Sequence, residues 1–187
     1  MLFKHFDQGS HESVDVMLLN LTELCVDDKR RKYSVIADWH PPEVGSYKYN
    51  VDGSSKGKPG LSGIGGVLRD SNGKVLCMFS FHTGILDSNI AELWAIKRAT
   101  DLIVSNSELY GCDILVVSDS KVAVSWVNQG DFGNIAQVDA IYDIRQNIKA
   151  WGSIKVVFDF RIFNSFADSL AKMGADSMGD FVEWGDI

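Results

Sequence analysis

Four acidic residues stand where a folded chain could bring carboxylates together. Asp52 and Asp119 each come at the end of a run typical of a β-strand. Glu92 falls in the first turn of a predicted helix, and Asp168 falls in a short helix near the C-terminus. Because ligands of α/β sheets gather where strands end, we expect the four side chains to converge although long segments separate them.

Converging carboxylates predict a metal site. Like charges held close together repel one another and take up protons at neutral pH unless a hard cation such as Mg²⁺ neutralises them. Two such ions, roughly 3.5 to 4 Å apart, can hold both the attacking water and the leaving oxygen of a phosphodiester. The residues therefore indicate phosphodiester hydrolysis with two Mg²⁺ ions, for which Mn²⁺ is a substitute.

Alternating patterns predict an antiparallel meander in the first half of the domain. Apolar residues alternate over 47–51, and Gly53-Ser-Ser is expected to break this strand just after Asp52. Strands are predicted over 63–69 and 74–82, joined by a turn at 70–73 whose Asn-Gly pair is typical of hairpins.

Helical and buried-strand patterns alternate in the second half. Asp87 to Asn89 predicts a helix start, and the residues that follow show apolar spacings of three and four. Strands are then predicted over 113–118 and 154–160, and helices over 120–128, 135–150 and 165–173. The expected fold is α/β, a five-stranded mixed sheet of three antiparallel strands and then two parallel ones, with helices on both faces.

One domain with two flanking segments accounts for the chain of 187 residues. Residues 1–38 show weak helical periodicity and are interpreted as an N-terminal extension, partly helical or disordered. The tandem prolines Pro41 and Pro42 cannot continue a helix, so the domain is expected to begin at residue 39 and to end at 174. Residues 175–187 are interpreted as an acidic C-terminal tail.

The net charge of -7 is unfavourable for a nucleic-acid partner, because phosphate binding normally requires a basic surface. Its distribution weakens this objection. Residues 39–173 carry 13 basic and 14 acidic groups, and four of the acidic groups are the candidate metal ligands. Bound cations would cancel much of that charge, so we expect modest, salt-sensitive affinity for a nucleic acid.

The spacing of the cysteines and the lack of a secretory signal indicate an intracellular protein. The N-terminus lacks the layout of a secretory signal, and the three cysteines are far apart and odd in number. No apolar run approaches the roughly 18 to 20 residues of a membrane helix. We expect a monomer in the nucleus or cytoplasm, neither secreted nor membrane-bound, with no protein partner that the sequence identifies.

Several short blocks resemble the ribonuclease H family and occur in the family's order. They are Asn50–Ser54, Gly65–Gly73, Asp87–Ile96, Val117–Lys121 and Arg161–Lys172. The blocks and the lead-in Trp39-His-Pro-Pro are most similar to the plant branch, which is related to the ribonuclease H domains of retrotransposon reverse transcriptases. The similarity spans residues 39–174 and leaves out residues 1–38.

The resemblance implies a ribonuclease H-like fold and an endonuclease that hydrolyses the RNA strand of RNA/DNA hybrids by a two-metal-ion mechanism. It implies that Asp52 bridges both ions and that Asp168 helps to hold the ion that activates water. Glu92 and Asp119 would bind the other ion. It also implies contacts between the hybrid and residues around the carboxylates, namely Gly53, Ser54, Ser88, Asn89, Ser120, Arg161 and Asn164.

One departure from many bacterial and animal relatives is the absence of a histidine on the loop before the last aspartate. All four histidines precede Glu92, and only Arg161 is available at this place, as is common in the plant branch. The departure predicts slow turnover.

Two other functions stay open. A retrotransposon-derived domain could bind nucleic acid with weak or no catalysis, although the four carboxylates are intact. A 3'-to-5' exonuclease of the same broad fold typically has an Asp-x-Glu pair on the first strand, whereas Asp52 is followed here by Gly53 and Ser54. An isolated acid at a strand end is also more often a turn or cap residue than a catalytic one.

Overall fold

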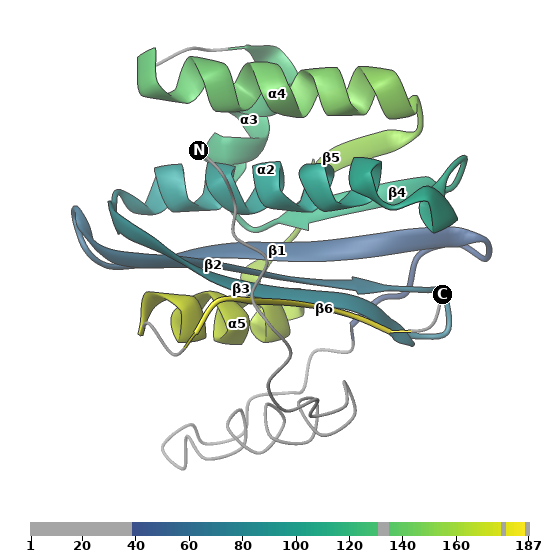
Figure 1. Ribbon diagram of the computed structural model, residues 1–187, viewed down its shortest axis with the longest axis horizontal. Helices are drawn as coiled ribbons and strands as arrows, with labels where there is room; N and C mark the ends of the chain where they lie inside the picture. The colour runs from purple at the N-terminus through teal and green to yellow at the C-terminus, as the bar shows by residue number, and fades with distance from the viewer. Residues whose placement is uncertain (1–38, 131–134, 177–178, 186–187) are drawn as a thin grey trace. The chain divides into compact units, whose positions relative to one another are not determined.

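The computed structural model describes residues 39–130, 135–176 and 179–185 (Figure 1). Six strands form one mixed sheet in the order β5-β4-β1-β2-β3-β6. Their bounds are β1 Ser46–Gly57, β2 Gly60–Arg69, β3 Val75–Leu86, β4 Asp113–Ser118, β5 Ile154–Phe158 and β6 Phe181–Trp184. The helix predicted within residues 1–38 lies outside the described residues.

Strand β1 sets the topology of the sheet. It pairs antiparallel with β2 and parallel with β4, while β2 pairs antiparallel with β3 and β4 pairs parallel with β5. This confirms the predicted mixed sheet of three antiparallel strands followed by two parallel ones. Because Asn50 is aligned with Val117, β1 and β4 carry Asp52 and Asp119 toward the same end of the sheet.

The predicted break of the first strand after Asp52 is wrong. Strand β1 continues through Gly53 and Ser54 to Gly57, and Ser54 is paired with Gly63 of β2. The Gly-Ser-Ser sequence is typical of a turn, but β2 runs beside its whole length. Pairing with a neighbouring strand therefore outweighs the local preference of these residues.

The sheet has six strands where five were predicted. The additional strand, β6, comes from the segment interpreted as an acidic tail, and it pairs antiparallel with β3 so that Val182 is aligned with Phe79. Val182 and Trp184 also pack against the apolar core. Phe181, Val182 and Trp184 favour a strand, but a run of four residues is too short to predict one, so the strand depends on the partner that β3 offers.

Helices cover both faces of the sheet, as predicted (Figure 1). Helices α2, α3 and α4 lie on one side, and α5 lies on the other. Their bounds are α2 Ser88–Ser105, α3 Lys121–Gln129, α4 Ile135–Trp151 and α5 Ser165–Ala175, with 3₁₀ turns η1 Ser107–Leu109 and η2 Arg161–Phe163. Among the described residues, no helix has both the length and the apolar character needed to cross a bilayer.

The start of α2 and its packing fix where Glu92 lies. The Asp87 side chain caps the helix by accepting a hydrogen bond from the backbone N–H of Asn89 at 2.9 Å, which confirms the predicted start. Leu93 and Ile96 are fully buried in one apolar cluster with Tyr49 of β1. Burial of each such side chain contributes about 1.5–3 kcal/mol, so α2 is held firmly against β1.

Helix α5 lies unusually close to the sheet because two residues of β2 have no side chain. A Cβ atom at Gly63 would be 2.1 Å from the backbone nitrogen of Ala175, and one at Gly65 would be 2.3 Å from that of Ala171. Gly65 is aligned with Asp52 across the β1–β2 pair. The close approach of α5 therefore occurs beside a candidate catalytic carboxylate.

We predict that Gly65→Ala destabilises the fold. The added methyl group would force α5 outward, which costs about 1–3 kcal/mol in the free energy of unfolding. Urea denaturation measures this loss. Lys155→Ala, at an exposed position of β5, is the control and should change stability by less than about 0.5 kcal/mol. A Gly65→Ala variant as stable as this control would contradict the close approach of α5.

Candidate active site

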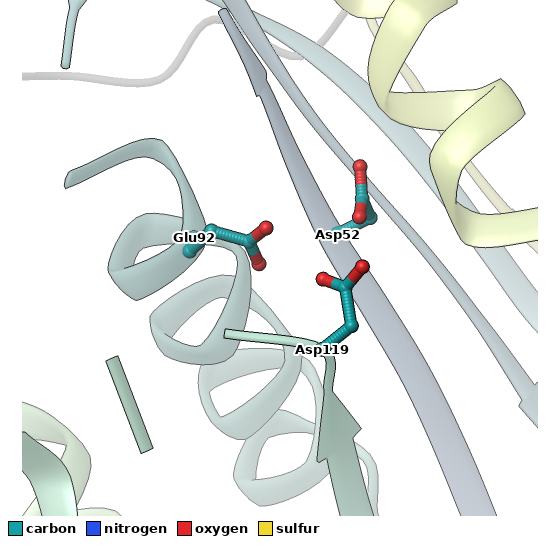
Figure 2. Close-up of side chains that lie close together, drawn as sticks. All are labelled: Asp52, Glu92 and Asp119. Carbon is teal, nitrogen blue, oxygen red and sulfur yellow. The ribbon is translucent and has the colours of Figure 1, made fainter. Parts of the chain in front are cut away.

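Three of the four predicted carboxylates meet at one end of the sheet. Asp52 comes from β1, Glu92 from the first turns of α2, and Asp119 from the residue after β4. Figure 2 shows the three side chains directed toward one another. Each offers one oxygen atom to a group in which all these atoms lie within 4.8 Å of one another.

A glycine beside Asp52 allows α2 to bring Glu92 into this cluster. A Cβ atom at Gly53 would lie 2.2 Å from the backbone nitrogen of Glu92 and 2.3 Å from the carbonyl carbon of Ala91. The resemblance implied that Gly53 gives the RNA backbone room to approach. The structure shows that the missing side chain also makes room for α2.

The clustered carboxylates are buried, which makes their charges costly. Asp52 is 3% exposed and Glu92 is 8% exposed. Burial, together with the charges of Asp119 and Asp168, raises the pKa of Asp52 to about 8. Burial and the charges of Asp52 and Asp119 raise the pKa of Glu92 well above its usual range. Ser118 Oγ donates to Glu92 Oε2 at 3.1 Å and opposes part of that rise.

The donor set fits a hard divalent cation. Its members are carboxylate oxygens, which Mg²⁺ and Mn²⁺ prefer to sulfur or nitrogen ligands. The surrounding pocket, of about 730 Å³, is lined by four carboxylates and two cationic side chains, Lys121 and Arg161, which gives a formal charge of -2. Two carboxylates with raised pKa values and this excess of negative charge are what a bound cation would relieve.

The fourth carboxylate, Asp168, lines the same pocket but lies outside the three-residue cluster. Arg161 Nη2 donates to its Oδ1 atom at 2.7 Å, and Lys172 Nζ donates to its Oδ2 atom at 2.5 Å. Arg161 Nε also lies 4.0 Å from Asp119 Oδ2. The hydrogen bond and the charge of Asp168 raise the pKa of Arg161 above its ordinary value, so this guanidinium stays charged.

Most of the predicted substrate contacts surround the carboxylates. The pocket lining includes Gly53, Ser54, Ser88, Asn89, Ser120 and Arg161. Asn164 is not among the lining residues. It is 2% exposed and its Nδ2 atom donates to the backbone carbonyl of Val51 at 2.8 Å. Here it ties the start of α5 to β1, and its contact with substrate stays a prediction.

Several residues of this site carried no assigned role in the sequence interpretation. Ser118 binds Glu92, Lys172 binds Asp168, and Phe158 and Phe160 line the pocket. Lys172 had a usable signal, because residues four apart on a helix are neighbours and an Asp followed by Lys at that spacing forms an ion pair. Nothing in the sequence distinguishes Ser118, Phe158 and Phe160 from ordinary strand residues.

Comparisons with known proteins identify the family. Residues 50–174 match the sequence model of the family described as "Reverse transcriptase-like". Over 137 residues the chain is also 47% identical to the Arabidopsis thaliana protein named "Putative ribonuclease H protein". The chain belongs to the reverse transcriptase-like branch of the ribonuclease H family. This confirms the resemblance drawn from the sequence blocks.

The match to the Arabidopsis protein covers 71% of this chain but only 21% of that protein. This ribonuclease H-type domain thus spans about a fifth of the length of that curated relative.

Solved structures agree on the fold. LC11-RNase H1, crystallised in complex with an RNA/DNA hybrid, superposes with a TM-score of 0.65 at 26% identity, over 71% of this chain and 99% of that one. RNase H1 of the halophilic archaeon Halobacterium salinarum gives a TM-score of 0.64 at 22% identity, over 71% and 99% of the two chains. The ribonuclease H-like fold predicted from the sequence is therefore confirmed.

We predict that the metal-free protein loses stability as the pH rises. Between the ordinary Asp value of 3.8 and about 8, the folded protein keeps a proton on Asp52 that the unfolded chain releases. The free energy of unfolding must therefore fall across this window, by at most about 1.4 kcal/mol per pH unit for each such proton. Urea denaturation in a chelating buffer, from about pH 5 to about pH 8, measures the slope.

Asp52→Asn should flatten this dependence, because the amide does not titrate and no longer raises the pKa of Glu92. The control is Asp113→Asn, at the exposed start of β4, which should keep the wild-type slope. Identical slopes for the wild type and Asp52→Asn would mean that Asp52 does not hold a proton in the folded state.

Proposed function

We propose that this chain is an endonuclease that hydrolyses the RNA strand of RNA/DNA hybrids with two divalent cations, Mg²⁺ being the natural ion. The observation that carries the proposal is the convergence of Asp52, Glu92 and Asp119, with oxygen atoms within 4.8 Å of one another, in a ribonuclease H family chain. The hybrid bound to LC11-RNase H1, a structural relative, supports the choice of substrate. We further propose that the protein acts as a monomer in the nucleus or cytoplasm.

The carboxylates divide into two sets of ligands. Glu92 and Asp119 would hold one ion together with Asp52, and Asp168 would help Asp52 to hold the other. When bound, such cations lower the pKa of water to give a nucleophile and stabilise the negative charge that develops on the phosphate. Asp52 would release its proton to solvent on binding a cation, and the Ser118 hydroxyl, which donates to Glu92, would hold that carboxylate in place.

Groups at the start of α2 suit recognition of the RNA strand. Ser88 and Asn89 line the pocket and offer a hydroxyl and an amide beside Glu92. A 2'-hydroxyl is both a donor and an acceptor, and it is what distinguishes RNA from DNA at such a site. The N-terminus of an 18-residue helix also favours a phosphate nearby.

Other residues that line the pocket are partly apolar and partly cationic. Phe160 is 64% exposed and Val122 is 42% exposed, and both line the pocket together with Lys121. These residues offer an apolar surface to a sugar or base and a cation to a phosphate. A nucleotide chain therefore has several suitable partners in the pocket besides the carboxylates.

We predict that the wild-type protein cuts the RNA of a hybrid in the presence of Mg²⁺ and not in the presence of EDTA. Asp52→Asn removes a buried ligand of both ions, and loss of several kcal/mol of transition-state stabilisation lowers the rate by roughly a hundredfold or more. Gel analysis of an end-labelled hybrid measures both the rate and the cut positions. Asp113→Asn serves as the control and should cut at the wild-type rate.

The same assay separates the competing functions. Internal cuts support an endonuclease, whereas a ladder that shortens from the 3' end indicates an exonuclease. Binding of the hybrid with no products in Mg²⁺ or Mn²⁺ would establish the inactive binding module instead. Single-stranded RNA and duplex DNA of the same sequence are included, because equal cutting of all three would contradict specificity for hybrids.

A further inference from the structure

The two oxygen atoms of Asp168 are both engaged by cations of the protein itself. Arg161, in the η2 turn, donates to Oδ1 at 2.7 Å, and Lys172, one turn later on α5, donates to Oδ2 at 2.5 Å. The Asp168 side chain is 15% exposed, whereas those of Arg161 and Lys172 are 72% and 55% exposed. The pair of cations therefore covers the carboxylate from the solvent side of the pocket.

The clustered carboxylates have a different environment. The Ser118 hydroxyl is neutral, so its hydrogen bond to Glu92 places no positive charge beside that carboxyl group. The contact between Arg161 Nε and Asp119 Oδ2, at 4.0 Å, is at the limit of an ion pair. Asp52, Glu92 and Asp119 form one possible cation site by themselves. The oxygens open to a first ion are thus those of the cluster, whereas both oxygens of Asp168 are already bound by cations of the protein.

We propose that Arg161 and Lys172 form a cationic clamp on Asp168 that opposes binding of the second divalent ion until a substrate phosphate draws the clamp away. This inference rests on the proposed function and adds a regulation of the same site. A cation that coordinates Asp168 must approach oxygens that a guanidinium and an ammonium group already bind, and it is repelled by their positive charges. The free protein therefore takes up one ion at the cluster, and Asp168 becomes a ligand only when the clamp has another partner.

A phosphate group is the partner that the clamp chemistry favours. Guanidinium groups bind phosphate with two parallel hydrogen bonds, and a lysine ammonium binds it as a point charge. Arg161 lines the pocket and both clamp residues are largely solvent-exposed, so they can turn toward a phosphate without breaking core packing. Binding of the polyanion and completion of the metal site are coupled in this way.

The test is a titration of the full, metal-free chain with Mn²⁺, followed by electron paramagnetic resonance and calorimetry without any substrate. The wild type should bind one ion tightly and a second at least about tenfold more weakly, the scale set by two partly exposed ion pairs. In the double variant Arg161→Gln with Lys172→Gln, affinity for the second ion should rise about tenfold. Its affinity for the first ion should stay within about twofold of the wild-type value.

Matched variants separate the clamp from a general change in charge. Lys121 is another cation that lines the pocket, and its ammonium group lies over the ring of Phe158. The variant Lys121→Gln should bind the second ion as weakly as the wild type does. Asp168→Asn should abolish the second site and keep the first. Lys172→Arg, which keeps the positive charge, should bind both ions with the wild-type affinities.

A hybrid whose RNA strand carries 2'-O-methyl groups supplies the phosphate without being cut. This hybrid should raise the affinity for the second ion about tenfold in the wild type. The rise should be much smaller in the double variant, whose clamp is already absent.

Equal affinities for two ions in the wild type, or a second site that the double variant leaves unchanged, would overturn the clamp. Neither result contradicts the proposed nuclease activity, which is tested by hybrid cleavage alone. Loss of hybrid cleavage in a protein that shows the predicted metal titration would reject the nuclease and leave the clamp standing. A protein that binds no Mn²⁺ at all rejects both.

Discussion

The site depends on holding three largely buried carboxylates close together. Asp52 and Glu92 are almost fully buried, and their oxygens lie within 4.8 Å of each other and of an Asp119 oxygen. Desolvation and mutual repulsion both oppose this arrangement, and the raised pKa values of Asp52 and Glu92 express that opposition. A rigid scaffold is needed to maintain it, because mobile side chains would move apart. The electrostatic strain is also what makes the cluster attractive to a divalent cation.

The scaffold achieves its rigidity through backbone contacts that only glycine permits. Gly53 lets the first turns of α2 lie against β1, and Gly63 and Gly65 let α5 lie against β2 on the opposite face. The two helices that carry Glu92 and Asp168 are thereby held close to the strand that carries Asp52. In these positions the absence of a side chain determines the geometry of the site as much as the acidic side chains do.

The site is asymmetric because its carboxylates reach it from opposite faces of the sheet. Glu92 comes from the α2 face and is supported by a neutral hydroxyl, whereas Asp168 comes from the α5 face and is covered by Arg161 and Lys172. The first arrangement leaves carboxyl oxygens available to a cation, and the second binds both oxygens to cations of the protein. One pocket therefore contains two carboxylate environments with different expected affinities for cations, although the sequence presents four similar acidic residues.

The sequence by itself determined the order and type of the elements, the hairpin turn, the cap of α2 and the identity of the acidic residues. These features follow from local periodicity, turn chemistry and family blocks, which act over a few residues at a time. The tertiary structure alone decided that β1 continues past Gly53, that β6 completes the sheet, and that Asn164 is buried. It also decided that Asp168 pairs with protein cations while the other three acids cluster. The pairing of Asp168 with Lys172 joins residues four apart on α5, but each of the other outcomes depends on which distant partner lies alongside, and spacing along the chain carries no information about that partner.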